Sequence, residues 1–315
     1  MATIIVPNHP DPHDDAEVLR KACEGWGTDE GGIIKVIGHR NAGQRKMIKE
    51  AYQSKYNEDL IRRFEKELSG DFERAVYRWM LEPFDRDAVL CHVSLKEKKA
   101  DFRTIIELSC IPHADEVLQM KRAYYARYNC SLEEDVASHF TGEMRMLMLL
   151  LVSVHRFESD ITDVKLAEKE AEILHDCIKK KEFKHEEMIR IVTTRNKTQL
   201  IATFYRFKNA YNTPVTKSLA VDKDDNFVAA LQTAIKCIKS PQKYLESVVS
   251  NAINKRGTDE DDLTRVVVTR AEKDLAQIKD LFHKKNGVKL EDAVAKEISG
   301  DYKKFILTLL GANCD

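Results

Sequence analysis

The stretch EGWGTDEGGII at residues 24–34 decides the fold, because its central four residues recur near the other end of the chain. Gly27-Thr28-Asp29-Glu30 reappears as Gly257-Thr258-Asp259-Glu260, 230 positions later and without a gap. Ser69-Gly70-Asp71 reappears at the same offset as Ser299-Gly300-Asp301. An internal repeat therefore organises the chain, and its period is the first thing to establish.

Two fainter copies of the repeat lie between these ends. A shift of 72 positions places Tyr56 on Tyr128, and a shift of 155 places it on Tyr211. The spacing predicts four repeats, with boundaries at 14–85, 86–157, 167–241 and 242–315. The segment EKEAEIL at 168–174, in the longest gap between copies, is predicted to be a connecting helix.

Each repeat has a helical hydrophobic period. Ile33, Val36, Ile37 and Arg40 follow the i, i+3, i+4, i+7 spacing of one helix face, and no alternating strand pattern occurs. Asn57 is a candidate N-cap for EDLIRRFEKEL, and Ser131-Leu-Glu-Glu134 has the pattern of a capping box. The sequence predicts an all-α fold of about five short helices per repeat. Because one repeat has a limited core, the four should pack together.

Composition restricts the class of protein. Lys and Arg number 51 and Asp and Glu number 52, so a net charge of −1 argues against a nucleic-acid binder. The seven cysteines are odd in number and include no CxxC pair, which favours a reducing compartment. The longest apolar run, residues 146–154, is too short to span a bilayer. The N-terminal stretch MATIIVPNHPDPHDD has no signal pattern, so a cytoplasmic protein with reversible membrane contact is expected.

The glycine-rich stretch has the chemistry of a calcium loop. Glu67 lies 40 positions after Gly27, and Glu297 lies 40 positions after Gly257. A glycine-rich loop can direct several backbone carbonyls inward, and one nearby carboxylate can add two more oxygens. Hard oxygen ligands in a roomy loop suit Ca²⁺, which takes about 6–8 of them, better than Mg²⁺ or Zn²⁺. Water or an external anion must complete such a shell.

Four repeats of this length, with a GxGT loop followed about 40 positions later by an acidic residue, resemble the annexin family. The resemblance covers the chain from residue 14 onward. The pattern of intact loops in the first and fourth repeats and degenerate loops in the second and third resembles the plant members of the family. It implies an all-α curved disc whose convex face binds Ca²⁺ and docks on acidic phospholipid. It also implies two sets of ligands. The first would be the carbonyls of Cys23, Gly25 and Gly27 with the Glu67 carboxylate, and the second the carbonyls of Ile253, Lys255 and Gly257 with the Glu297 carboxylate.

The chain departs from the family pattern in three of its loops. Lys255 stands where the fourth loop should have its first glycine. The second repeat has residues 96–100 (KEKKA) in place of the loop and His139 in place of the acid. The third keeps Asp222 but has residues 180–183 (KKEF) in place of the glycines. We expect no calcium site of this type in the second or third repeat.

Trp26 and its counterpart Arg256 would lie at the tips of the two loops. Trp is favoured in the interfacial zone of a membrane, so Trp26 is predicted to insert there and Arg256 to meet phosphate head groups. The alternative is that Trp26 folds back onto its own helices.

Several other patterns are weighed and interpreted as structural. His39 matches a position associated with peroxidase activity in some plant annexins. A haem peroxidase needs a proximal ligand and a haem-sized pocket, and a lone histidine at a helix end is more often a structural or dipole-facing residue. Asp29-Glu-Gly-Gly32 matches DxxG, a short nucleotide pattern that chance supplies freely. Ile189-Arg190-Ile191 matches a short actin-binding motif of the family, yet it has the spacing of a core helix face. The recurring arginines Arg40, Arg195 and Arg270 should pair with acids or cap helices. Two cysteines suspected of redox sensitivity, Cys110 and Cys237, should be buried.

The sequence thus favours a calcium-dependent, peripheral membrane-binding protein that is not an enzyme. Its expected cofactor is Ca²⁺, and its expected partners are acidic phospholipid membranes. The alternatives are a redox-linked or nucleotide-hydrolysing enzyme on the same scaffold, or a cytoskeletal adaptor that binds actin.

Overall fold

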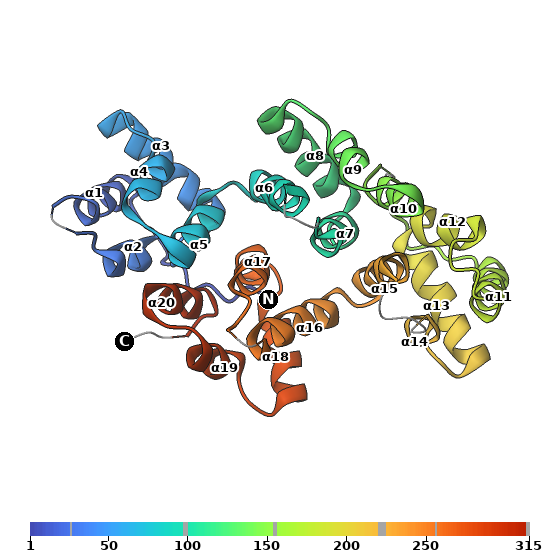
Figure 1. Cartoon of the computed structure of the whole chain (residues 1–315). Helices are drawn as coiled ribbons and strands as arrows, with labels where there is room; N and C mark the ends of the chain where they lie inside the picture. The colour runs from blue at the N-terminus through green and yellow to red at the C-terminus, as the bar shows by residue number, and fades with distance from the viewer. Residues whose placement is uncertain (26, 97–99, 154–155, 220–224, 256, 313–315) are drawn as a thin grey trace. The chain divides into compact units, whose positions relative to one another are not determined.

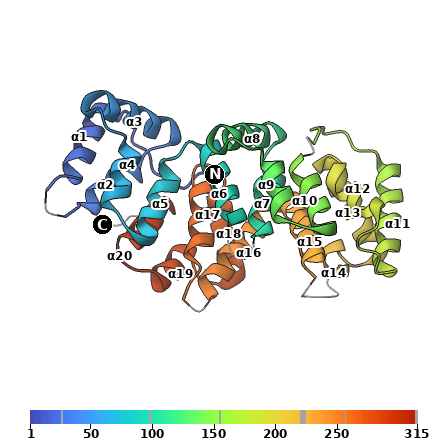
Figure 2. The same ribbon diagram turned by 45° about the horizontal axis from the view of Figure 1, so that its top comes forward.

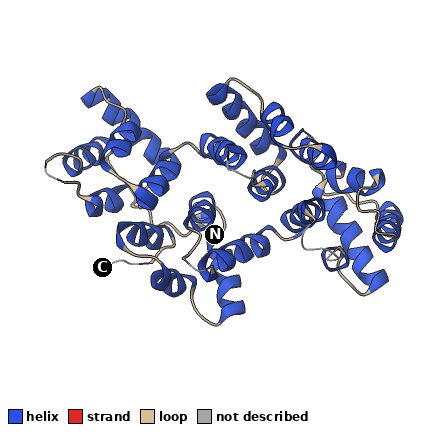
Figure 3. Ribbon diagram, viewed as in Figure 1, coloured by secondary structure: helices blue, strands red, loops and turns tan. Residues whose placement is uncertain are grey.

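The computed structural model describes residues 1–25, 27–96, 100–153, 156–219, 225–255 and 257–312. These residues form 20 helices and no strand (Figures 1 and 3). The fold is therefore all-α, as predicted. In chain order the helices fall into four groups of five, which correspond to the four repeats.

Two compact units divide the chain, and each joins two repeats. The first unit contains residues 1–86 and 242–315, and the second contains residues 87–241. The first group of helices in the first unit is α1 (Pro12–Ala22), α2 (Glu30–Ile37), α3 (Ala42–Tyr56), α4 (Leu60–Glu67) and α5 (Gly70–Met80). The second group is α16 (Pro241–Asn254), α17 (Glu260–Arg270), α18 (Leu275–Asn286), α19 (Leu290–Glu297) and α20 (Gly300–Leu309).

The second unit begins within α6 (Pro83–Lys96) and ends after α15 (Asn226–Lys239). Between them lie α7 (Phe102–Cys110), α8 (Ala114–Tyr128), α9 (Leu132–His139), α10 (Gly142–Ser153), α11 (Val164–Lys179), α12 (Glu186–Thr194), α13 (Lys197–Tyr211) and α14 (Val215–Ser218). Helix α7 packs on α15, and α10 packs on α12 and α15, so the second and third repeats share one core. No described helix has the length and hydrophobicity needed to cross a membrane.

In the first unit, helices of the first and fourth repeats bury their apolar faces against each other. Helix α20 packs against α2 and α5, and Figures 1 and 2 both show the three side by side. The rings of Phe72 and Phe305 meet edge to face with centroids 5.9 Å apart. The predicted helical period is confirmed for Ile33, Val36 and Ile37, which are all buried, whereas Arg40 lies beyond the end of α2.

The N-terminal segment is tied to the fourth repeat by backbone hydrogen bonds. The Thr3 amide donates to the Ala271 carbonyl at 2.8 Å, and the Ala276 amide donates to the Met1 carbonyl at 3.2 Å. A Cβ added to Gly311 would lie 2.5 Å from the Thr3 carbonyl oxygen, so only glycine permits this close approach. The first residues of the chain are therefore part of the packing of its last repeat.

Two local predictions are corrected by the structure. Asn57 is the C-cap of α3 in the left-handed conformation, with φ +51°, while Asp59 is the N-cap of α4. Asn tolerates that conformation, and Asn129 and Asn212 end the matching helices in the same way. The segment at 168–174 is not a connection, because it lies inside α11, which packs along α13 as α1 packs along α3. The capping box of Ser131 and Glu134 is confirmed.

Candidate metal centre

The first loop connects α1 to α2 through two glycines. Gly25 has φ +106° and Gly27 has φ +89°. Residues other than glycine rarely adopt backbone angles in this region. The Asp29 amide donates to the Ala22 carbonyl at 2.9 Å and closes the loop. Asp29 also caps α2, because its carboxylate accepts a hydrogen bond of 2.9 Å from the Gly32 amide. The loop is thus held at its base while its tip carries the glycines.

Glu67, the last residue of α4, lies beside this loop. The Thr28 hydroxyl is 3.3 Å from Glu67 Oε2 and donates to it. The Glu67 side chain is 26% exposed, so its carboxylate remains open to solvent on one side. Residues about 40 positions apart in the sequence therefore meet at one site.

Arg63 lies one helical turn before Glu67 and connects it to the loop. Arg63 Nη2 is 3.0 Å from Glu67 Oε1, and the same nitrogen donates to the Cys23 carbonyl. A single cationic group thus contacts a backbone carbonyl and the carboxylate that were both predicted as calcium ligands. Their oxygens converge on a position that accepts positive charge, so the residues present fit a hard cation.

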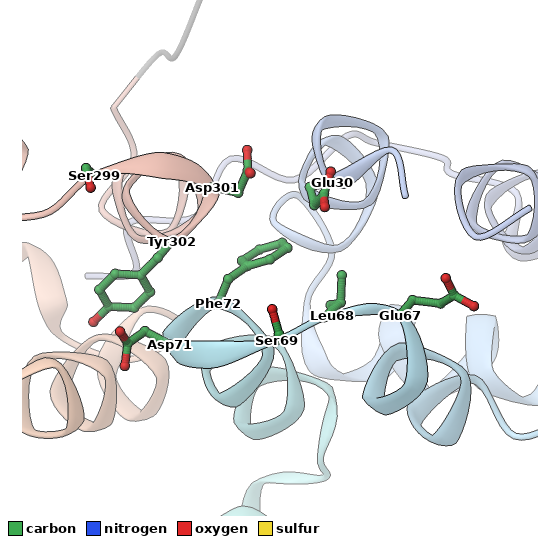
Figure 4. Close-up of a pocket in the computed structure, with 9 residues that line it drawn as sticks. All are labelled: Glu30, Glu67, Leu68, Ser69, Asp71, Phe72, Ser299, Asp301 and Tyr302. Atoms are coloured by element: carbon green, nitrogen blue, oxygen red, sulfur yellow. The ribbon is translucent and has the colours of Figure 1, made fainter. Parts of the chain in front are cut away.

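An acidic pocket of about 260 Å³ adjoins this site within the first unit. Figure 4 shows Glu67 at its edge, with a carboxylate that points away from Phe72 and Tyr302. Three further carboxylates line the pocket, and their negative potential favours a cation nearby. They belong to Glu30, Asp71 and Asp301.

The fourth loop is closed at its base like the first but differs at its tip. The Asp259 amide donates to the Ala252 carbonyl at 2.9 Å, and Gly257 has φ +81°. The Lys255 carbonyl, a predicted ligand, accepts a hydrogen bond of 2.9 Å from the Thr258 amide. Thr258 itself has φ +37°, which is unfavourable for a β-branched residue. Because a carbonyl oxygen has two lone pairs, the Lys255 carbonyl still has one available for a cation.

The remaining predicted ligands of the fourth loop, Ile253 and Glu297, lie near the ends of two helices. Ile253 is buried at the end of α16, whereas Glu297 is exposed at the end of α19. The position that corresponds to Arg63 in this repeat is Ala293, so no guanidinium bridges this loop to its acid from that position. Lys255 Nζ instead pairs with Asp259 at 2.6 Å.

Part of the predicted membrane contact lies outside the described residues. Trp26 and Arg256 are these residues. Asp222 and residues 97–99, in the repeats where no calcium site is expected, also lie outside the described part of the chain. Among the described residues, no group of three or more His, Cys, Asp or Glu side chains is arranged to hold a metal ion. In the second repeat, His139 Nδ1 lies 2.7 Å from the carbonyl of Asp135 in its own helix.

Sequence reasoning missed Arg63 and Thr28 as neighbours of the predicted ligands. The signal for Arg63 was present, since residues four apart on a helix face the same side. Its partner Glu67 is predicted from the sequence as a ligand of the ion, which gives no indication of the pair. Thr28 belongs to the recurring Gly-Thr-Asp-Glu run, and its hydroxyl had been given no role.

The recurring arginines pair with acids, as predicted. Arg40 contacts both oxygens of Asp15, at 2.6 and 2.7 Å. Arg195 is 2.6 Å from the buried Glu170, which occupies the position of Asp15 in its repeat. Arg270 pairs with Asp274 on its own C-terminal side, also at 2.6 Å.

The other motifs have structural roles in the described part of the chain. His39 Nδ1 lies 3.1 Å from the carbonyl of Lys35, in the last turn of the preceding helix α2. The side chains of Ile189 and Ile191 are buried, as expected of a core helix face. Cys110 and Cys237 are also buried, and burial raises the pKa of the Cys110 thiol. Burial likewise raises the pKa of the Cys23 thiol to about 11, so that this side chain stays protonated and only its carbonyl suits a cation.

Comparison with known proteins gives matches along the chain. The annexin family model matches residues 14–79, 169–233 and 246–309. Annexin-like protein RJ4 from Fragaria ananassa is 53% identical over 311 residues, which cover 99% of both chains. Annexin D6 from Arabidopsis thaliana is 46% identical over 314 residues, with the same coverage. The solved structure of annexin III superposes with a TM-score of 0.92 at 29% identity, covering 99% of this chain and 97% of that one.

Proposed function

This chain belongs to the annexin family, whose members generally bind phospholipid in a calcium-dependent manner, and we propose that it docks reversibly on acidic membranes through its first and fourth loops. The proposal places the protein in the cytoplasm and on membranes when Ca²⁺ rises. It also treats the protein as a binding protein rather than an enzyme.

One observation carries the proposal. The Cys23 carbonyl and the Glu67 carboxylate both contact the same cationic group, the Arg63 guanidinium. Two predicted ligand oxygens from separate segments of the chain therefore contact the same positive charge. The positive φ values of Gly25 and Gly27 give the loop a backbone conformation that residues other than glycine rarely adopt.

The residues of the loop would each contribute to docking in a defined way. When bound, Ca²⁺ would supply the positive charge that links the loop to anionic head groups. The carbonyls of Cys23, Gly25 and Gly27 would hold it with the Glu67 carboxylate, and a lipid phosphate would complete the shell. The capping bond of Asp29 would keep the loop fixed relative to α2 meanwhile. In the fourth repeat, Ile253, Lys255, Gly257 and Glu297 would act in the same way.

Charge and loop composition support the need for a bridging ion. The net charge of −1 gives no general attraction to an anionic surface. Trp26 would insert into the membrane interface beside the first loop, and Arg256 would meet phosphate beside the fourth.

Co-sedimentation tests this function most directly. Full-length protein would be centrifuged with phosphatidylserine vesicles, with Ca²⁺ or with a chelator, and in parallel with neutral phosphatidylcholine vesicles. We expect the protein to pellet only with acidic vesicles and Ca²⁺. Equal pelleting in chelator, or none under any condition, would contradict the proposal.

A further inference from the structure

The Arg63 guanidinium contacts two oxygens that are predicted to bind the cation. Its Nη2 donates to the Cys23 carbonyl and lies 3.0 Å from Glu67 Oε1. An Arg⁺ and a Ca²⁺ that contact the same two oxygens repel each other and compete for their lone pairs. Whatever cation binds the first loop must first displace this side chain.

The fourth repeat provides an internal comparison. With the offset of 230 that superposes the two loops, Arg63 corresponds to Ala293 and Glu67 to Glu297. Glu297 is exposed, and no ion pair joins it to a described residue. Among the described residues, a cationic side chain thus contacts Glu67 but none contacts Glu297.

We propose that Arg63 is a built-in competitor of Ca²⁺ that makes the first site weaker than it would otherwise be. This inference rests on the proposed function, since it concerns how strongly the same site binds its ion. The first loop would therefore fill only after Arg63 has moved away from Glu67 and Cys23.

The surroundings of Arg63 allow that movement. Its side chain is 22% exposed, although its Nε is buried without a hydrogen-bond partner among the described residues, so part of the guanidinium faces solvent. Glu58 offers a second acid, with its Oε1 4.0 Å from Arg63 Nη1. Arg63 can therefore exchange one carboxylate for another, which limits the cost of its release.

The competition can be measured at the first site alone. In a Glu297→Gln background, which removes the acid of the fourth site, Arg63→Ala should tighten Ca²⁺ binding in the presence of phosphatidylserine vesicles. A partly exposed ion pair and one charge-assisted hydrogen bond correspond to a gain of roughly 5- to 30-fold. Alanine maintains the helix, and the far-ultraviolet circular dichroism and melting temperature in chelator would check that α4 is intact.

Arg62→Ala is the matched control. Arg62 is exposed on the same helix and carries the same charge, but its side chain makes no hydrogen bond or ion pair with described residues. If Arg63 acted only through general repulsion, the two variants would tighten binding alike. We expect Arg62→Ala to change Ca²⁺ affinity by less than about twofold.

The reverse transplant tests the same idea at the fourth site. In a Glu67→Gln background, Ala293→Arg should place a guanidinium one turn before Glu297 and weaken Ca²⁺ binding by a similar factor. A readout that does not involve membranes is the arginine side-chain NMR spectrum. The Nε–H resonance of Arg63, identified by its loss in Arg63→Ala, should shift when Ca²⁺ is added, and that of Arg62 should not.

The outcomes separate this inference from the proposed function. Equal Ca²⁺ affinity with and without the Arg63→Ala substitution, or an Arg63 resonance that does not move while Ca²⁺ binds, would overturn the competition alone. Absence of binding in the Glu297→Gln background, with binding retained in Glu67→Gln, would also overturn it and would leave the fourth loop as the membrane site. Absence of binding in the wild-type chain would overturn the proposed function itself.

Discussion

Arg45 of the first repeat pairs with Glu272 of the fourth, with Nη2 2.9 Å from Oε2. The Arg45 side chain is only 1% exposed and stacks on Trp79, with its guanidinium carbon 3.7 Å from the ring centroid. Burial lowers the pKa of Arg45 to about 10, so the side chain is still charged near neutral pH. A buried charge with one carboxylate partner thus joins the two repeats of the first unit.

Glu272→Ala should therefore destabilise the protein. Removing one partner of a buried pair leaves an uncompensated charge, at a cost of roughly 3 kcal/mol. Thermal unfolding followed by circular dichroism would measure this as a clear fall in melting temperature. Glu24→Ala, which breaks an exposed pair with Arg20, is the control and should change stability little. Similar effects of both substitutions would show that Glu272 does not carry this role.

The double variant Glu67→Gln, Glu297→Gln should lose calcium-dependent vesicle binding while keeping its helical content. Each substitution preserves side-chain shape but removes the charge that a hard divalent cation requires. Co-sedimentation with phosphatidylserine vesicles, together with circular dichroism, would test it. If this variant pelleted like the wild-type protein, the ligand assignment would be wrong.

Replacing each of the two tryptophans by alanine should affect different properties: stability for Trp79 and membrane binding for Trp26. Trp79 is fully buried and its indole N–H donates to the Ile37 carbonyl at 2.8 Å, so Trp79→Ala should cost roughly 3–5 kcal/mol of stability. Trp26→Ala should instead weaken vesicle retention and leave the melting temperature almost unchanged. A large loss of stability in Trp26→Ala would mean that this side chain packs on its own helices.

Calcium and lipid should bind cooperatively. Three carbonyls and one carboxylate leave a calcium shell incomplete, and a lipid phosphate supplies both oxygen and charge. By linkage, Ca²⁺ must raise lipid affinity by the factor that lipid raises Ca²⁺ affinity, and roughly 1–3 kcal/mol is typical of such coupling. Calorimetric titration of Ca²⁺ with and without phosphatidylserine vesicles would measure the factor. Identical affinities in the two titrations would exclude bridging.

His92 in the second unit should make stability depend on pH. Its ring stacks on that of Tyr128, with the ring centroids 3.8 Å apart. His92 Nδ1 lies 3.1 Å from the Tyr124 hydroxyl oxygen and 3.6 Å from Asp135 Oδ2. Burial lowers the pKa of His92 below its ordinary value of 6.5 despite the opposing charge of Asp135. The folded state then binds this proton less readily than the unfolded state does. Its contribution is therefore present above about pH 6.5 and is lost as the pH falls through the folded-state pKa.

The comparison that isolates this effect is His92→Phe, which keeps an aromatic ring for Tyr128 but cannot titrate. Between about pH 7 and pH 5 the wild-type protein should lose more stability than the variant, as measured by thermal or urea unfolding. Parallel curves for the two proteins would rule out His92 as the source.

Much of the architecture could be predicted because it depends on local patterns that repeat. The spacing of Ile33, Val36 and Ile37 predicted a buried helix face, and the recurrence of Arg40, Arg195 and Arg270 predicted acid pairing. Asn57 was misassigned because Asn both caps helix starts and tolerates the left-handed conformation at helix ends. The two roles differ in whether the helix lies before or after the asparagine, and the residue type alone does not show which.

The candidate site could be predicted only in part, for a physical reason. The offset from Gly27 to Glu67 identified segments that do meet, through Thr28. However, a sequence offset does not show which side chain lies next to the predicted ligands in the folded protein. Arg63 at the first site and the Thr258–Lys255 hydrogen bond at the fourth depend on backbone and rotamer geometry that the repeat pattern does not specify.

The discontinuity of the first unit has a consequence for the order of events during synthesis. Residues 87–241 form an uninterrupted segment, so the second unit can complete its core as soon as that segment has left the ribosome. The first unit cannot, because helices α1–α5 pack against helices that are translated last. Thr3 must wait for Ala271 before its amide finds a partner. The part of the protein that is made first is therefore the part that finishes folding last, and until then its apolar faces need protection from other chains.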